Sequence, residues 1–538
     1  MAVHAPTKRT HAPSRRTAGN QPAPGGPPGR LALRRLFSPR KLWRQARTTL
    51  KGGFVLLAVC IGLLALTQTL LVAQLFQHAL DDLNTISRDS IPSVNAAQAL
   101  AQYIEDIDAK AADYLATAGF TSQEPCAIPG IDIPGLTLTV HDCDDRTIAA
   151  EITLANQQLD LAAHNVTYPG ERTAIERIEL GLQVYLSDIR LMQYEYGLAD
   201  SKTNPSDPHL VQAYASYQVA GITLHQAIFP PNTGEVSSVP TLSESDVPAC
   251  VLDGRTIPGP SWPLGSLEEN IGCLNSINRI QLDAAYADAT TFLGISAAII
   301  LGSCLLLCGF LLLVFWRMVK VTHRVINPGL GLAALVGVIF CFGTILFAAH
   351  LAGPHGTFAQ IAVDSYGSVY ESAQLERDVT TANADESRWL IAVEFGDQES
   401  MARWQQDWLN DVKQVNDLLN TAFANQPHPE DAKNLKDIQA NWDRFYQIDE
   451  QVRLAANNTA NPNRVIDAER LSTGDSNTAV AAFTQAAEQL GTVNQGYYNQ
   501  ALTSTRDTLT RTILLSYLLF PLIGLAAVWG IAYRLKEF

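Results

Sequence analysis

Four long hydrophobic stretches without charge divide this chain of 538 residues. They cover residues 52–76, 292–316, 329–351 and 513–533, and none of them contains Asp, Glu, Lys or Arg. About 20 apolar residues are enough for a helix to cross the roughly 30 Å of hydrocarbon in a bilayer. The pattern therefore predicts four transmembrane helices and excludes a soluble cytosolic enzyme. The first stretch is longer than the apolar core of a signal peptide, so we expect it to remain as an anchor.

Basic residues mark the side of the membrane on which each connecting segment lies. Segments 1–51, 317–328 and 534–538 together hold 17 of the 38 Lys and Arg residues and one of the 53 Asp and Glu residues. Basic residues in short flanks stay in the cytoplasm. We therefore expect a multi-pass plasma-membrane protein with both termini in the cytoplasm and with segments 77–291 and 352–512 outside. These two segments carry a net charge of −31, which disfavours nucleic acid as a partner.

Segment 77–291 continues in a helical pattern. Apolar residues recur every three or four positions through 94–114 and again through 175–192, as in long helices that pack at shallow angles. Two further helices are expected near 208–226 and 266–291, the last of them running into the second span.

Segment 352–512 repeats this plan. Its apolar seams run through 369–390, 404–415 and 438–452, and a last helix over 466–512 enters the fourth span. The predicted fold class is an all-α membrane protein: four transmembrane helices with two extracellular domains that resemble four-helix bundles.

The two halves also share residues. Adding 275 to the residue numbers places 52–76 on 327–351, which is the third span. The same shift, without a gap, aligns identical residues at six of the 28 positions in 93–120. We interpret the chain as an internal duplication of a unit made of span, bundle and span.

The N-terminal segment has two parts. Residues 1–29 are rich in Pro, Gly and Arg and are expected to be a disordered basic tail. Residues 30–51 interleave basic and apolar side chains and are expected to lie at the membrane surface, on anionic lipids. The alternative is a docking site for a cytosolic protein, with these candidate contact residues: Arg34, Arg35, Lys41 and Arg44.

Cysteines separate into two groups. Cys60, Cys304, Cys308 and Cys341 lie inside the spans and are expected to be small apolar fillers. The other four all lie in segment 77–291, where an oxidising compartment favours two disulfides. Three pairings are possible, and we favour the local ones: Cys126 with Cys143 and Cys250 with Cys273. The spacing does not suit a zinc site.

Two parts of the first domain interrupt the helical pattern. Residues 227–265 carry seven prolines and are expected to be irregular. Residues 131–133 and 136–140 flank Pro134-Gly135 and predict a small β-hairpin insertion, closed by the first disulfide. His141, Asp142, Asp144 and Asp145 follow it; we interpret them as a solvated turn, with a cation site as the alternative.

Catalytic chemistry finds no support in the sequence. The chain has no Gly-rich phosphate loop after a strand, no HExxH and no GxSxG, and its 11 histidines are scattered. We therefore expect a protein that is not an enzyme, with no catalytic residue, no metal and no cofactor. The spans also lack the charged residues that mark ion pathways, which disfavours transport.

The expected helix from Ile91 to Phe120, which continues from a membrane span, resembles the four-helix-bundle sensor domains of bacterial chemoreceptors and histidine kinases. Two such units in one chain resemble the GlnX-type four-span membrane proteins of Gram-positive bacteria. The segment 382–390, Ala-Asn-Ala-Asp-Glu-Ser-Arg-Trp-Leu, is similar to an Ala-x-Ala-Asp-Glu-Ser-x-x-Leu stretch of that family. The resemblance implies an extracellular amino-acid-binding lipoprotein and a cytosolic Ser/Thr kinase as partners.

The leading hypothesis is a bacterial transmembrane sensor or adaptor for signal transduction, which relays an extracellular signal to a separate cytoplasmic partner. The alternative is a structural scaffold or accessory subunit of a larger membrane complex. Formation of a homo-oligomer stays open. Four exterior basic residues are candidates for binding an anionic ligand, with ordinary surface ion pairs as the alternative: Arg88, Arg172, Arg377 and Arg388.

Overall fold

The computed structural model describes residues 50–117, 123–131, 133–228, 250–252, 255–257, 265–323, 327–353 and 356–536. Within these residues the chain is almost entirely helical. The first half contains α3 (Leu50–Thr85), η1 (Ile86–Ser90), α4 (Ile91–Ala116), β1 (Gln123–Pro125), β2 (Thr137–Thr139), α5 (Val140–His164), α6 (Glu171–Leu198), α7 (Pro208–His225), β3 (Cys250–Leu252), β4 (Arg255–Ile257) and α8 (Leu267–Thr322). The second half contains α9 (Pro328–Ala352), α10 (Thr357–Ala359), η3 (Gln360–Ser365), α11 (Tyr366–Phe395), α12 (Gln398–Ala424), α13 (Asp431–Asn457), α14 (Arg464–Arg470), η4 (Leu471–Ser476) and α15 (Asn477–Leu535). The η elements are single π-helical turns.

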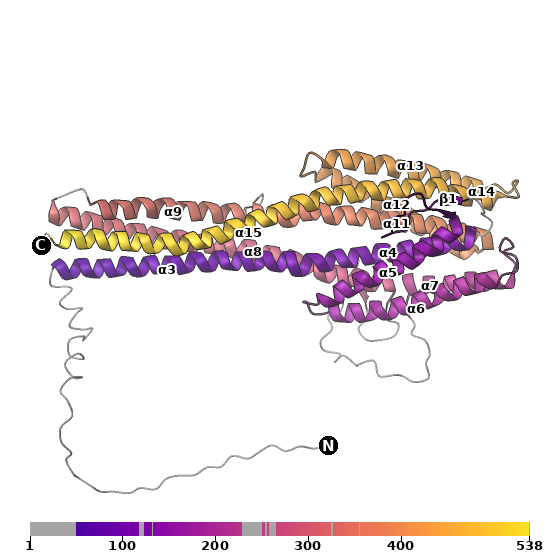
Figure 1. Ribbon diagram of the computed structural model, residues 1–538, viewed down its shortest axis with the longest axis horizontal. Coiled ribbons are helices and arrows are strands. Elements are labelled where there is room, and N and C mark those ends of the chain that lie inside the picture. Colours follow the sequence, from indigo (N-terminus) through magenta and orange to yellow (C-terminus); the bar gives the residue numbers. More distant parts are fainter. Residues whose placement is uncertain are drawn as a thin grey trace, which may run out of the picture.

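Four helices form a slender stem that opens into two helical bundles lying side by side (Figure 1). The stem contains α3, α9 and the C-terminal halves of α8 and α15. The start of α3, the end of α8, the start of α9 and the end of α15 all lie at the same end of the stem. Each of the four predicted spans falls within one helix that is long and apolar enough to cross a membrane.

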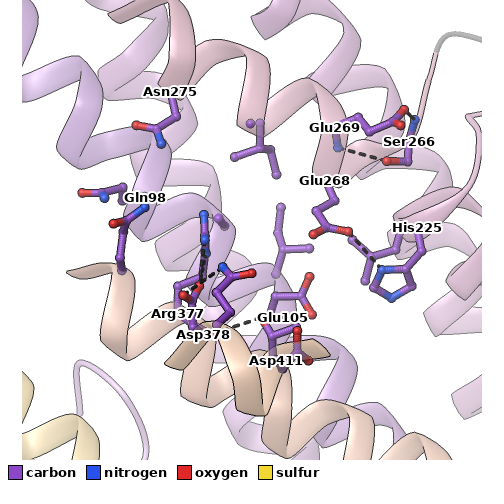
Figure 2. Close-up of a pocket in the computed structure, with 18 of the residues that line it drawn as sticks. Gln98, Glu105, His225, Ser266, Glu268, Glu269, Asn275, Arg377, Asp378 and Asp411 are labelled. Atoms are coloured by element: carbon purple, nitrogen blue, oxygen red, sulfur yellow. Dashed lines mark hydrogen bonds and ion pairs between the residues drawn. The ribbon is translucent and has the colours of Figure 1, made fainter. Parts of the chain in front are cut away.

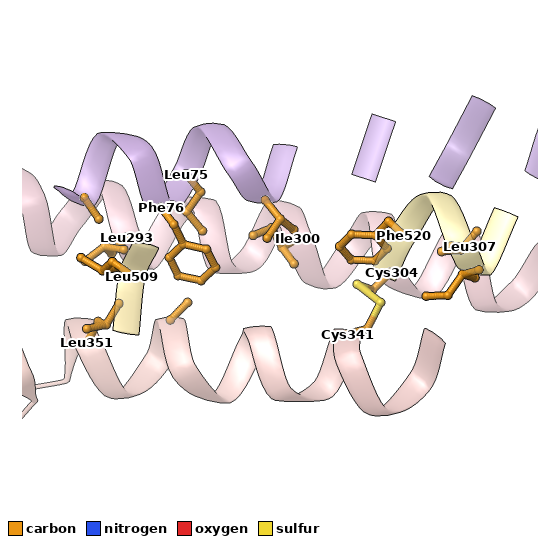
Figure 3. Packing of buried hydrophobic residues seen from close by; sticks show 14 of the residues in the cluster. Leu75, Phe76, Leu293, Ile300, Cys304, Leu307, Cys341, Leu351, Leu509 and Phe520 are labelled. Atoms are coloured by element: carbon orange, nitrogen blue, oxygen red, sulfur yellow. A yellow bond between two sulfur atoms is a disulfide. The ribbon is translucent and has the colours of Figure 1, made fainter. Parts of the chain in front are cut away.

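The stem has an apolar interior and an apolar exterior. Phe76, Ile300 and Phe520 are among its fully buried side chains and point into the space between the ribbons (Figure 3). On the outer face, Leu305 and Leu525 are more than half exposed. Apolar residues on both sides of a helix are expected where lipid takes the place of water.

Close contacts tie α9 to α15 at the end of the stem. The Asn327 side chain accepts a hydrogen bond from the backbone N–H of Leu330 and so caps α9. It also donates to the carbonyl oxygen of Gly530 in α15, at 3.0 Å. A Cβ on Gly329 would lie 2.7 Å from the Cα of Gly530, so only glycine allows the helices to approach this closely.

Two cysteines inside the stem correct the sequence prediction. Cys304 of α8 and Cys341 of α9 are not apolar fillers but form a disulfide, which is visible between the two helices in Figure 3. The two helices are neighbours, and their rotation brings these two side chains face to face. Cys60 and Cys308 are free.

The two disulfides predicted from the sequence both belong to the first bundle. Cys126 and Cys143 are bonded to each other, as predicted. Cys273 is also disulfide-bonded. The side chain of Cys250 lies outside the described residues, so the pairing of Cys250 with Cys273 stays a prediction.

The insertion at the tip of the first bundle is a β-hairpin, but its strands differ from those predicted. β1 pairs antiparallel with β2, with Glu124 opposite Leu138, while Ile131 forms only an isolated bridge with Ile128. A second short antiparallel pair joins β3 and β4.

The first bundle also contains a helix that the sequence analysis missed. Residues 141–145 are not a solvated turn but the first turns of α5, which Thr139 caps by accepting a hydrogen bond from the backbone N–H of Asp142. The His141 ring stacks on Tyr114, with 3.9 Å between ring centroids. Asp144 is buried, 3.8 Å from Lys110 of α4. The first bundle therefore uses α4, α5, α6, α7 and the start of α8, whereas the second uses α11, α12, α13, α14 and the start of α15.

Helices α4 and α11 form the seam between the bundles and run in the same direction. Tyr366 donates to Asn95 at 3.1 Å, and Gln98 donates to the carbonyl oxygen of Tyr370 at 3.4 Å. A π-helical turn precedes each of the two helices, at 86–90 and at 360–365. The two are joined to the stem differently, however, because α4 continues directly from α3 through η1, whereas α9 and α10 are separate helices.

Candidate functional site between the bundles

The centre of the seam is a fully buried arginine. The guanidinium group of Arg388 in α11 donates to Asp108 Oδ2 at 2.6 Å and to Glu105 Oε2 at 2.9 Å, both in α4. It also donates to Asp385 Oδ1, one turn earlier in α11, at 2.7 Å. All four side chains are at most 4% exposed. We call these four residues the Arg388 cluster.

Two tyrosines complete the surroundings of Asp108. Tyr185 of α6 donates to Oδ1 and Tyr217 of α7 donates to Oδ2, each at 3.0 Å. Burial, together with the charge of Asp108, raises the pKa of both phenols well above the usual value, so both keep the proton that they donate. Asp108 is therefore satisfied from three other helices, and the Arg388 cluster together with the two tyrosines holds α4, α6, α7 and α11 at one point.

The cluster holds more negative charge than positive charge. One guanidinium faces three carboxylates, and Asp411 of α12 adds a fourth carboxyl group that lies near Glu105 in Figure 2. Burial and the neighbouring Asp385 raise the pKa of Asp411 to about 10. Burial also raises the pKa of Asp385 to about 6, although Arg388 opposes this. The Oδ2 atoms of Asp385 and Asp411 are both buried and have no other hydrogen-bond partner. If Asp411 is protonated, it can donate this proton to Asp385, and the hydrogen bond then satisfies both carboxyl groups.

A cleft of about 790 Å³ opens beside the cluster. Its walls come from α4 and the start of α8 in the first bundle and from α11 and α12 in the second, so both bundles are needed to form it. Figure 2 shows Gln98 and Asn275 on one side of this cleft, with Glu105 and Asp411 on another. A cavity of this size suits a small organic ligand.

The described lining of the cleft is acidic. It contains three arginines, Arg279, Arg377 and Arg388. It also contains seven acidic residues: Glu105, Glu268, Glu269, Asp378, Asp385, Asp407 and Asp411. Even with His225 counted as protonated, the excess of carboxylates leaves the lining negative.

Glu105, His225 and Glu268 form the one group of potential metal ligands among the described residues, with one ligand atom from each within 4.8 Å of the others. His225 Nδ1 and Glu268 Oε2 already contact each other at 3.3 Å. Glu105 is held by Arg388, whose positive charge would oppose a divalent ion. These residues do not form a ready metal centre.

The structure separates the four arginines that the sequence analysis singled out. Arg377 and Arg388 line the cleft, whereas Arg88 and Arg172 are exposed elsewhere on the first half. Arg388 is not a surface ion pair, because the cluster buries it completely. The other candidates, Arg34, Arg35, Lys41 and Arg44, lie outside the described residues.

Sequence reasoning missed the carboxylates of the site. Glu105 and Asp108 flank Ile104 and Ile107, which belong to the apolar seam of α4, and all four are buried. Acidic residues one turn apart on the buried face of a helix need a partner. That pattern, matched by Asp385 and Arg388 in α11, was the available signal for a buried ion cluster.

Comparison of the chain with models of protein families, with curated proteins and with solved structures gave no match.

Proposed function

We propose that this protein is a sensor in the plasma membrane that relays a signal from its two bundles to a separate partner at the far end of the stem, without catalysis. The observation that carries the proposal is the Arg388 cluster, which joins the two bundles beside a ligand-sized cleft. A ligand that changes the contacts in this cleft would change how α4 lies against α11. It can do so only through a difference in affinity for two arrangements, typically about 1–3 kcal/mol.

The helices offer a route from the cleft to the stem. α4 continues through η1 into α3, and α8 and α15 each pass from a bundle into the stem as one helix. Shifts of packed helices by about 1–2 Å are a common form of signal transmission. The π-helical turn η1 lies on the route from α4 to α3, and such turns are frequent at functional positions.

We further propose that the two halves arose by duplication. The shift of 275 that aligns the sequences also aligns η1 with η3 and α4 with α11 to within a residue at their starts. Parallel pairing of α4 with α11 across the seam is what a pair of equivalent units would form. The hairpin at β1 and β2 and the extra helix α7 would then be additions to the first unit.

The orientation and partners of the sensor follow from the charge distribution and the family resemblance. The stem would cross the membrane with the bundles outside, because the basic segments 1–51 and 317–328 favour the cytoplasm. Segment 30–51 would lie on anionic lipids or receive a cytosolic protein. The GlnX-type resemblance suggests a binding lipoprotein outside and a Ser/Thr kinase inside.

The alternative is a scaffold whose bundles serve as spacers. The two proposals differ in whether a change in the Arg388 cluster reaches the end of the stem. Spin labels at Lys51→Cys of α3 and Ala532→Cys of α15, both exposed positions, would report the distance between these helices in nanodiscs. Cys60 and Cys308, the free cysteines of the described chain, would be replaced by Ser.

Arg388→Gln should shift the distance distribution between the two labels, whereas the matched change Arg172→Gln, on the exposed start of α6, should leave it unchanged. Tyr217→Phe, which removes the hydroxyl that donates to Asp108, provides a milder perturbation if Arg388→Gln does not fold. If the folded cluster variants leave the distance unchanged, the relay proposal fails and the scaffold replaces it.

A further inference from the structure

The cleft keeps buried acceptor atoms that have no donor in the described chain. Gln98 is only 3% exposed, and its Nε2 donates to Tyr370, but its Oε1 has no partner. Asn275 Oδ1 also has no partner, and the Oδ2 atoms of Asp385 and Asp411 have none apart from a proton that the two carboxyl groups share. A buried acceptor without a donor is unfavourable. All four line one cleft, so a single ligand rich in N–H donors could satisfy them.

The charges of the cleft also favour a cation. Its seven acidic side chains exceed its three arginines, and two of those arginines are already neutralised. Arg388 is held by three carboxylates, and Arg377 donates to Asp378 Oδ1 through two nitrogens, at 2.7 and 3.0 Å. The third, Arg279, lies over the ring of Tyr370, at 4.5 Å, and pairs with Asp283, at 3.6 Å, so that its Nη1 is the one buried arginine nitrogen of the lining without a hydrogen-bond partner among the described residues. An anionic ligand would find few free positive charges here.

The size of the cleft distinguishes an organic cation from a bare metal ion. A volume of about 790 Å³ is far more than one ion with its ligands occupies, and it lies in the range of sites for small organic molecules. The free acceptors are also spread around the cleft, with Gln98 and Asn275 apart from Asp411 in Figure 2. A ligand that reaches all of them needs donors at more than one position.

We propose that this cleft binds a small organic polycation with two or more ammonium or guanidinium groups. Its donors would pair with Asp385 and Asp411 at one end, where the ligand takes the place of the shared proton, and with Gln98 and Asn275 at the other. The inference rests on the proposed sensor function, for which it supplies the class of ligand.

The test uses the full chain in nanodiscs of neutral lipid and measures binding of spermidine by calorimetry. The informative variant is Asp411→Asn, because the amide can still donate to Asp385 as the protonated carboxyl does but cannot become negative. The matched control is Asp417→Asn, an exposed acid on the same helix that lies outside the cleft. We expect Asp411→Asn to weaken spermidine binding about tenfold or more, and Asp417→Asn to have little effect.

Parallel titrations with glutamate, Ca²⁺ and Zn²⁺ complete the design. Absence of spermidine binding would overturn the inference, and so would equal binding by all variants, which indicates adhesion to the acidic surface. Binding of glutamate or of a metal ion in place of spermidine would overturn it as well. The distance between spin labels at Lys51→Cys and Ala532→Cys, measured with and without spermidine, tests the relay proposal separately from the binding site. Spermidine that binds in the cleft without changing this distance supports the site and contradicts the relay.

Discussion

Arg388 and Asp108 are 280 residues apart in the chain, yet their side chains form a 2.6 Å ion pair that is almost completely buried. The pair connects the two helices, α4 and α11, that form the seam between the bundles. Two charges removed from water are stable only when hydrogen bonds satisfy their remaining atoms. The tyrosines on Asp108 and the second and third carboxylates on Arg388 fulfil this condition.

Loss of Arg388 should therefore destabilise the contact between the bundles. Arg388→Met leaves three carboxylates without their cation, and breaking a buried pair in this way typically costs about 3–5 kcal/mol. Arg388→Lys should recover only part of this, because an ammonium group cannot reproduce the three directed hydrogen bonds of the guanidinium. Thermal unfolding in nanodiscs measures the effect, with Arg172→Gln as the control. A melting temperature of Arg388→Met equal to that of the control would contradict the structural role of the cluster.

Stability should decrease as the pH rises from about 5 to 8. Burial raises the pKa of Glu386 to about 8 and that of Glu394 to about 7, both above the ordinary value for glutamate. Because these pKa values are raised in the folded state, protonation favours folding. The stabilisation is complete below the pKa of the unfolded chain and is lost as the pH rises through the folded values.

The slope should be at most about 1.4 kcal/mol per pH unit for each group. Glu386 accepts a hydrogen bond from Ser472 at 2.7 Å and lies near Asp449 and Arg453. Glu386→Gln keeps a neutral side chain of the same shape, so it should flatten the dependence of the melting temperature on pH. A slope that is unchanged in this variant would show that Glu386 titrates normally.

The disulfide inside the stem should hold the two halves of the chain together after cleavage. A protease site inserted between His323 and Asn327 cuts the connection between α8 and α9. The fragments should migrate together on a denaturing gel without reductant and separate with it, because Cys304 and Cys341 lie on opposite sides of the cut. In the Cys304→Ser variant the fragments should separate with and without reductant. In the Cys308→Ser control they should separate only with reductant, as in the unsubstituted chain. Separation of the unsubstituted chain without reductant would show that the disulfide does not form.

Membrane-impermeant labelling tests the proposed orientation. Two variants, His323→Cys at the end of α8 and Asp443→Cys on the exposed face of α13, would each be made in a chain whose Cys60 and Cys308 are replaced by Ser. On intact cells we expect labelling at 443 but not at 323, because segment 317–328 is basic. Permeabilised cells, in which both positions should react, are the control. Labelling at 323 on intact cells would reverse the proposed topology.

Local patterns in the sequence were sufficient for the spans and for most helices. Each uncharged stretch lies in a helix that can cross a membrane, and the apolar seams of α4, α6, α11 and α13 are buried as predicted, except that Val369 of α11 is half-buried. This is because helical periodicity and membrane hydropathy depend on residues a few positions apart. The helix α5 was not predicted, because its start, residues 141–145, is polar enough to resemble a turn. Only the packing of His141 on Tyr114 and of Asp144 near Lys110 shows that this polar turn faces the interior.

Tertiary structure alone decided the bond between Cys304 and Cys341 and the roles of the four arginines. The sequence contains both cysteines, but the rotation of α8 against α9 determines whether their sulfur atoms meet. In the same way, the residues near Arg388 in the chain do not show which distant carboxylates pair with it, and Arg172, chosen on the same grounds, is exposed. What separates them is that α11 packs beside α4, which brings Glu105 and Asp108 to Arg388 from a distant part of the chain. A buried charge is defined by its partners, and those partners come together only when the helices pack.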